Sequence, residues 1–194
     1  MKEKVHVNHK LLFVMLFTLV IVSRIPFLQS GYGIDSDAWS VANASGYISQ
    51  THLYQASRSP GFPIHEILTS FFVQLGPVGV NGATAVVGAM GVLASYYFFI
   101  LTRTRYPLLF AITIAFTPII YVASTMAIDY MWGYTFVFMC LVLLYHRKFV
   151  LSGILLGLAI GCRISSILFI IPATLFLWKT KAGLPSIRNF LSLT

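Results

Sequence analysis

Charged residues are scarce in this chain, and acidic residues most of all. Lysine, arginine, aspartate and glutamate together make up 9% of the 194 residues, and only five of these are acidic. A soluble globular domain carries about 25% charged residues. The scarcity therefore excludes an ordinary soluble domain. Apolar residues make up 58% of the chain, with a mean hydropathy of +0.84, which predicts an all-α, polytopic membrane helical bundle.

Cysteine is also rare, and no segment collects positive charge on one polar face. The two cysteines, Cys140 and Cys162, both lie in apolar segments, so the sequence predicts no disulfide framework. The thirteen lysines and arginines occur in ones and twos. Nucleic-acid-binding proteins concentrate such residues on one face, so a nucleic-acid partner is excluded.

The basic residues mark the points where the chain turns between apolar runs. Short basic loops are typical of the cytoplasmic side of a membrane, which places the N-terminus on that side. We predict a single transmembrane domain over 1–194, embedded in the lipid bilayer, with about five or six membrane segments. The predicted segments are 11–28, 78–101, 108–127 with a kink at Pro118, 130–145 and 149–178. The last is interpreted as a tight hairpin with Arg163 near its outer tip, and one long span is the alternative.

Acidic residues gather on the predicted outer side. The longest polar stretch, about 29–65, is expected to form a large first extracytoplasmic loop, and Asp35, Asp37, Glu66 and Asp129 all fall at this face. Carboxylates are costly in a bilayer, so their gathering indicates a functional site; the alternative is that Asp35 and Asp37 are solvated loop residues. Residues 35–37 also have the D-x-D form that can hold a divalent metal, which would need further oxygen ligands from elsewhere.

Two arginines are candidates for anion binding. Arg58 lies in the stiff segment 57–63 (SRSPGFP), and its guanidinium is suited to bidentate phosphate contacts; a lipid-headgroup contact is the alternative. Arg163 interrupts an apolar run, where it must pair with an acid, bind an anion or extend to the membrane surface. Residues 66–75, which come after the Arg58 segment, have amphipathic spacing and are expected to lie along the membrane interface.

The order of these features resembles the N-terminal half of the GT-C glycosyltransferases. The nearest likeness is to the protein O-mannosyltransferase and aminoarabinose-transferase group and the rhizobial-type bacterial enzymes. The resemblance rests on an outer loop with residues 37–42 (DAWSVA), the segment 57–63, a later outer loop with Asp129, and a glycine-rich helix over 153–161 that leads into Arg163. It covers nearly the whole chain, although each motif is short.

That resemblance implies a reaction and a role for each site residue. It implies transfer of a hexose or pentose from a polyprenyl-phosphate donor to an acceptor at the extracytoplasmic face. Asp37 corresponds to the catalytic base, and Asp35, Arg58, Asp129 and Arg163 are implied to bind substrate. The chain departs from the family at position 38, where an alanine replaces the frequent second acid. No cofactor is predicted with this assignment, and a divalent metal stays open.

The resemblance also raises an alternative function. Family members run to several hundred residues, so the chain is expected to be the N-terminal part of such an enzyme, an integral multi-pass protein of a cell or endoplasmic-reticulum-type membrane. The alternative is a non-catalytic membrane subunit that binds a polyprenyl-phosphate lipid or a partner enzyme. A transporter is disfavoured, because transporters place charge near the bilayer midplane, whereas these acids lie at one interface.

Overall fold

The computed structural model describes residues 9–179, and within them every regular element is a helix. The all-α prediction is confirmed for this part of the chain. The α-helices are α1 (His9–Arg24), α2 (Ser36–Thr51), α3 (Pro63–Ser70), α4 (Gly76–Leu101), α5 (Pro107–Phe116), α6 (Pro118–Ala123), α7 (Tyr130–Tyr145), α8 (Phe149–Cys162) and α9 (Ile170–Lys179), and short 3-10 helices cover Ile25–Phe27, Val73–Leu75 and Ile164–Phe169.

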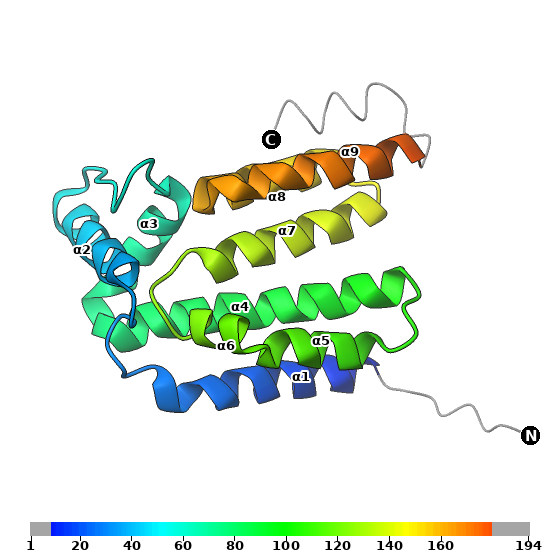
Figure 1. The fold of residues 1–194 in the computed structure, drawn as a ribbon, viewed down its shortest axis with the longest axis horizontal. Coiled ribbons are helices and arrows are strands. Elements are labelled where there is room, and N and C mark those ends of the chain that lie inside the picture. The colour runs from blue at the N-terminus through cyan, green and yellow to red at the C-terminus, as the bar shows by residue number, and fades with distance from the viewer. Residues whose placement is uncertain (1–8, 180–194) are drawn as a thin grey trace, which may run out of the picture.

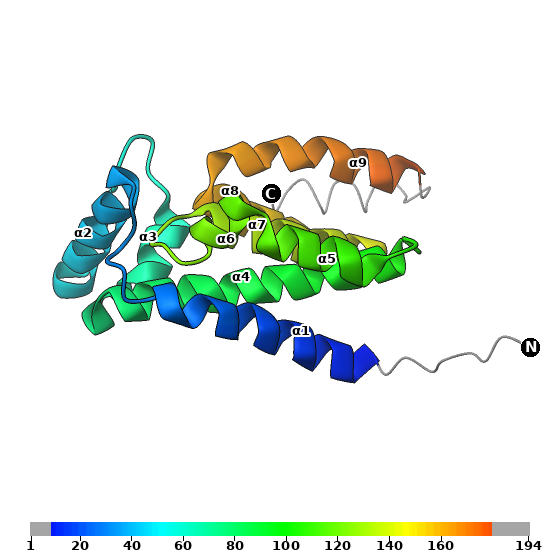
Figure 2. The same ribbon diagram turned by 60° about the horizontal axis from the view of Figure 1, so that its bottom comes forward.

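Most helices run along one long axis, and two lie at one end of the bundle. Figures 1 and 2 show α1, α4, α5, α7, α8 and α9 along this axis, with α2 and α3 at the end where α1 finishes and α4 begins. We call this the site end. The opposite end, where α1 begins and where the turns at 102–106 and 146–148 lie, is called the basic end.

Small residues let the long helices approach closely. Gly91 on α4 faces α7, where a Cβ atom would overlap the Thr135 hydroxyl and the Tyr134 ring. Helices in lipid pack through such small residues, because lipid offers no hydrophobic force to drive them together. Gly91 therefore fixes how near α4 and α7 can lie.

Pro118 divides one predicted segment into two helices. Thr117, the residue before it, is extended with φ −61° and ψ 127°, so α5 ends at Phe116 and α6 begins at the proline. Proline disfavours helical geometry at the preceding residue and lacks an N–H to continue the ladder. The kink predicted at Pro118 is confirmed.

The 149–178 segment folds back on itself. Helix α8 ends at Cys162, Arg163 is extended with φ −155° and ψ 110°, and the chain returns through Ile164–Phe169 into α9. Figure 1 shows α8 and α9 along the same axis. The helices of the predicted hairpin are thus present, with Arg163 at their turn.

Two helices in residues 9–179 are long and apolar enough to cross a membrane, judged by length and composition. They are His9–Phe27 and Val73–Leu101, with mean hydropathies of 2.0 and 1.8. The remaining apolar helices are shorter: Pro107–Phe116, Tyr130–Tyr145, Phe149–Cys162 and Ile164–Trp178. Helix length thus supports two spans, against the five or six expected from the sequence.

The expected outer loop over 29–65 contains a helix, α2. Small and apolar side chains on one of its faces are buried, among them Ala38, Val41 and Ile48. Helix α3 also differs from expectation: it begins at Pro63 and ends at Ser70, before a 3-10 turn. Both helices pack against each other at the site end, so this region is folded structure rather than an open loop.

Candidate functional site

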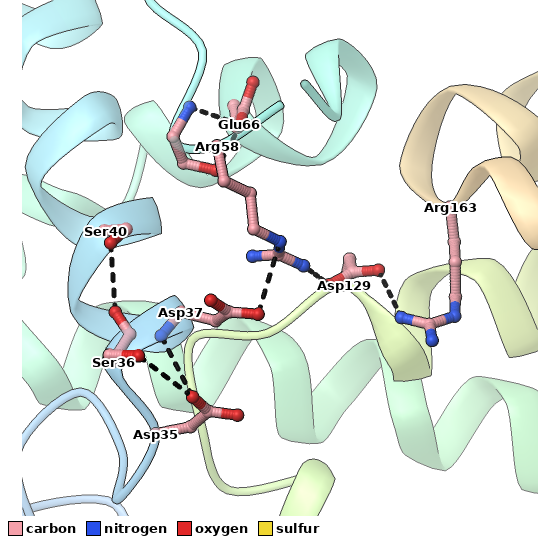
Figure 3. Close-up of polar contacts among 9 residues, drawn as sticks. Asp35, Ser36, Asp37, Ser40, Arg58, Glu66, Asp129 and Arg163 are labelled. Carbon is pink, nitrogen blue, oxygen red and sulfur yellow. Dashed lines mark hydrogen bonds and ion pairs between the residues drawn. The ribbon is translucent and has the colours of Figure 1, made fainter. Parts of the chain in front are cut away.

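Four charged side chains that the sequence singles out meet at the site end. Asp37 lies in the first turn of α2, Arg58 between α2 and α3, Asp129 just before α7, and Arg163 just after α8. Figure 3 shows the two guanidinium groups on either side of Asp129, with Asp37 beside Arg58. Three ion pairs join these four residues, and the pair between Arg58 and Asp129 spans the greatest separation, 71 positions of the chain.

Asp129 is the central carboxylate of this cluster. Its side chain is completely buried, with Oδ1 2.8 Å from Nη2 of Arg58 and Oδ2 2.9 Å from Nη1 of Arg163. It precedes α7 but makes no capping bond to that helix, so both oxygens are directed to the arginines. A buried carboxylate is tolerated only when it is paired in this way. Asp129 therefore ties the segment before α3 to the turn after α8.

Asp37 is the accessible carboxylate of the cluster. Its Oδ2 lies 3.3 Å from Nε of Arg58, and its side chain is 41% exposed, compared with 21% for Arg58. Its place in the first turn of α2 also puts the negative charge near the positive end of the helix dipole. Asp37 can thus reach a molecule outside the protein while it contacts Arg58.

Aromatic rings support both arginines. The guanidinium carbon of Arg58 lies 4.3 Å from the ring centre of Phe62, and that of Arg163 lies 4.0 Å from that of Tyr130. These stacked contacts hold each guanidinium plane while leaving its edge for hydrogen bonds. The Nη1 atom of Arg58 is buried and has no hydrogen-bond partner among the described residues. One donor of Arg58 is therefore unused by the protein.

Asp35 stands beside this cluster without an ion pair in it. Its Oδ1 accepts the backbone N–H of Asp37 at 3.1 Å and so caps α2. Within residues 9–179 no group of three or more histidine, cysteine, aspartate or glutamate residues is placed to hold a metal. The first aspartate of the D-x-D triplet thus acts as the N-cap of α2.

Glu66 is a site residue whose role the sequence did not reveal. It is fully buried on α3 and accepts hydrogen bonds from the Tyr54 hydroxyl at 2.8 Å, the Ser57 N–H at 2.8 Å and the Ser57 hydroxyl. Burial, together with this bond to Glu66, raises the pKa of Tyr54 to about 12. Glu66 thus fixes the irregular segment that ends at Arg58.

His65 lies next to this site but outside its ion pairs. It is fully buried, packs edge-on against Trp132, and neither ring nitrogen has a hydrogen-bond partner among the described residues. Burial lowers its pKa to about 4, against the opposing effect of the Asp129 and Glu66 carboxylates. The imidazole is therefore neutral at neutral pH. His52, which caps the C-terminal end of α2, has a left-handed conformation with φ 59°.

An apolar cavity opens beside the acidic end of α2. It has a volume of about 620 Å³, and its lining includes Asp35 and Ser36 together with apolar residues of α6 and of the turns before α7, such as Ile119 and Met126. This volume falls in the range of about 300–1,000 Å³ typical of small-molecule sites. Polar and apolar parts of one ligand could both be accommodated here.

The sequence singled out all four residues that the ion pairs join. Asp37, Arg58, Asp129 and Arg163 are brought together, Asp35 is adjacent, and Glu66 was known only as an acid of the outer face. Comparison with protein-family models, with curated proteins and with solved structures finds no significant match for this chain.

Proposed function

We propose that the chain is a polytopic membrane protein whose bundle axis crosses the bilayer. Apolar side chains that are half or more exposed occur along the long helices, on α1 (Val14), α5 (Leu109), α8 (Leu151) and α9 (Ile171). A helix of a soluble bundle would present polar residues on such faces. Helix α7, with 16 residues, extends about 24 Å, so flanking residues would complete a crossing of ~30 Å.

Charge along the axis supports one orientation. Every acidic residue described by the structure lies at the site end, and five basic residues lie at the basic end, namely Lys10, Arg103, Arg105, Arg147 and Lys148. Basic residues favour the cytoplasmic side. The site end would then be extracytoplasmic, in a cell or endoplasmic-reticulum-type membrane.

At this end, the proposed reaction is sugar transfer from a polyprenyl-phosphate donor. The observation that carries the proposal is the contact between Asp37, a carboxylate open to solvent, and Arg58, which retains one unused donor. In this reaction an acceptor hydroxyl attacks the anomeric carbon while Asp37 takes its proton. The bond from that carbon to the carrier phosphate breaks, and the electron pair leaves with the phosphate, which Arg58 stabilises.

Asp129 and Arg163 contribute to this reaction by positioning Arg58. Asp129 holds Arg58 from the side opposite Asp37, and Arg163 holds Asp129. Such placement matters because a guanidinium that stabilises a leaving group must already lie where the charge develops. Neither residue needs to touch the reacting atoms.

The test is the Asp37→Asn variant, measured against a panel of undecaprenyl-phosphate-linked hexoses and pentoses. Loss of a positioned base is expected to lower transfer by about 10²–10⁴-fold, with membrane insertion unchanged. Asn43→Ala is the matched control, because Asn43 is an exposed residue of the same helix and contacts no residue of the cluster. Full activity of Asp37→Asn would show that Asp37 is not the base.

A non-catalytic membrane subunit is the second candidate function. It is favoured by the equal numbers of positive and negative groups in the cluster. The two carboxylates and two guanidinium groups of the cluster neutralise each other. Groups paired so completely can serve to hold a fold or bind a lipid phosphate without turnover. This candidate predicts binding of undecaprenyl phosphate, measured by native mass spectrometry, and no transfer from any donor of the panel.

A further inference from the structure

An apolar groove lies at the other end of the bundle, far from the cluster described above. It has a volume of about 520 Å³ and is lined by α1, α4, α7 and α8, with Phe13, Met90, Ala94 and Tyr97 among its residues. Met90 and Tyr97 are seven residues apart on α4, about 10 Å of helix. The groove therefore extends some way along the bundle toward its middle.

The mouth of the groove is marked by a pair of polar rings. The hydroxyl of Tyr97 lies 3.2 Å from Nε2 of His146, and the two rings are stacked with their centres 5.8 Å apart. His146 follows the last residue of α7 and is exposed. The groove thus opens where the apolar helices give way to the turn at 146–148.

Positive charge lies next to the Tyr97 and His146 pair in the sequence. Arg147 and Lys148 follow His146 directly, and both side chains are exposed. Figure 1 shows the turn between α4 and α5 at the same end. Arg103 and Arg105 belong to this turn. Within residues 9–179 no acidic residue lies at this end, so none of the described carboxylates neutralises this charge. An occupant that is apolar along its length and anionic at its head would match both features.

From this match we infer that the groove binds a phospholipid with an anionic headgroup. One acyl chain lies against Met90, Ala94 and Tyr97, and the headgroup phosphate lies beside Arg147 and Lys148. Basic pockets between transmembrane helices on the cytoplasmic side bind anionic headgroups in this manner. The inference rests on the proposed membrane orientation, but it is independent of sugar transfer.

The probe is a mixed micelle of phosphatidylcholine and phosphatidylglycerol, with retained lipids counted by native mass spectrometry. One cation near an anionic lipid contributes roughly a fivefold preference. We expect phosphatidylglycerol to be enriched at least about fivefold over its share of the mixture, and the enrichment to fall in high salt. Equal retention of both lipids, or retention of neither, would overturn the inference.

Two variants, each with a matched control, separate the headgroup from the groove. Arg147→Gln with Lys148→Gln should remove the enrichment, and Arg147→Lys should keep it. Ala94→Phe, which fills the groove, should abolish retention, whereas Val86→Phe on an exposed part of α4 should not. Enrichment that survives Ala94→Phe would show only attraction to the basic surface. If the Gln pair fails to fold, the salt dependence of the unaltered protein still decides the headgroup claim.

Separate measurements distinguish failure of this lipid-binding inference from failure of the proposed function. Asp37→Asn lies at the site end and should retain phosphatidylglycerol like the unaltered protein. Carbonate extraction of membranes reports embedding separately: a chain that is released would contradict the orientation on which both proposals rest. A chain that stays embedded but shows no lipid preference would contradict this inference alone.

Discussion

Replacing Asp129 with asparagine tests whether burial determines the strength of an ion pair at this site. Asp129 is completely buried and takes one hydrogen bond from each of Arg58 and Arg163. Removing one partner of a buried pair costs about 3–5 kcal/mol. Because the two arginine side chains are 21% and 36% exposed, solvent compensates part of this loss, and we expect Asp129→Asn to cost about 2–3 kcal/mol.

The same change can be made at Asp37, which contacts the same arginine. Its carboxylate is 41% exposed, so Asp37→Asn should cost about 1 kcal/mol or less. The measurement is equilibrium unfolding in mixed micelles, followed by loss of helical circular dichroism. A double-mutant cycle of Asp129→Asn with Arg163→Gln should give a coupling energy of about 1–2 kcal/mol. Equal costs at positions 37 and 129 would refute the reasoning.

Three further predictions concern residues around the site and the bundle core. The imidazole of His65 has a pKa of about 6.5 in the unfolded chain and about 4 in the folded one, so the free energy of unfolding should fall by about 3 kcal/mol as the pH drops from 6.5 to 4. In a pH series of unfolding measurements, His65→Leu should remove that loss. Glu66→Gln should free the segment before Arg58, seen as faster backbone hydrogen exchange there, while α7 exchanges as before. Gly91→Ala should destabilise the bundle by about 1–3 kcal/mol in thermal unfolding, because its Cβ would overlap Thr135; an unchanged midpoint would contradict that close approach.

The ends of several long helices could be predicted from the sequence, because they are determined by neighbouring residues. Pro118 breaks a helix through its own ring and the residue before it, and Arg163 marks a turn because a charge interrupts an apolar run. Helix α2 escaped prediction for an equally local reason. Its buried face is built largely of alanine and serine, such as Ala38 and Ser45, which give little hydrophobic periodicity.

The candidate site shows a different limit. Asp37 and Asp129 were singled out because acidic residues are scarce in this chain, Arg58 because it lies in a stiff segment, and Arg163 because it interrupts an apolar run. Their pairing depends on contacts between residues 71 and 34 positions apart, which no local pattern encodes. The role of Glu66 was hidden for the same reason, because its partners lie in an irregular segment without periodicity.

The arginines on either side of Asp129 share its carboxylate, and each binds a different oxygen. A phosphate that draws Arg58 outward would leave Oδ1 without a partner in a buried position. Arg163 already binds Oδ2, and a guanidinium can engage both oxygens of a carboxylate at once. A single buried carboxylate thus links the irregular segment before α3 to the turn between α8 and α9, so a change at either arginine alters the charge balance of both.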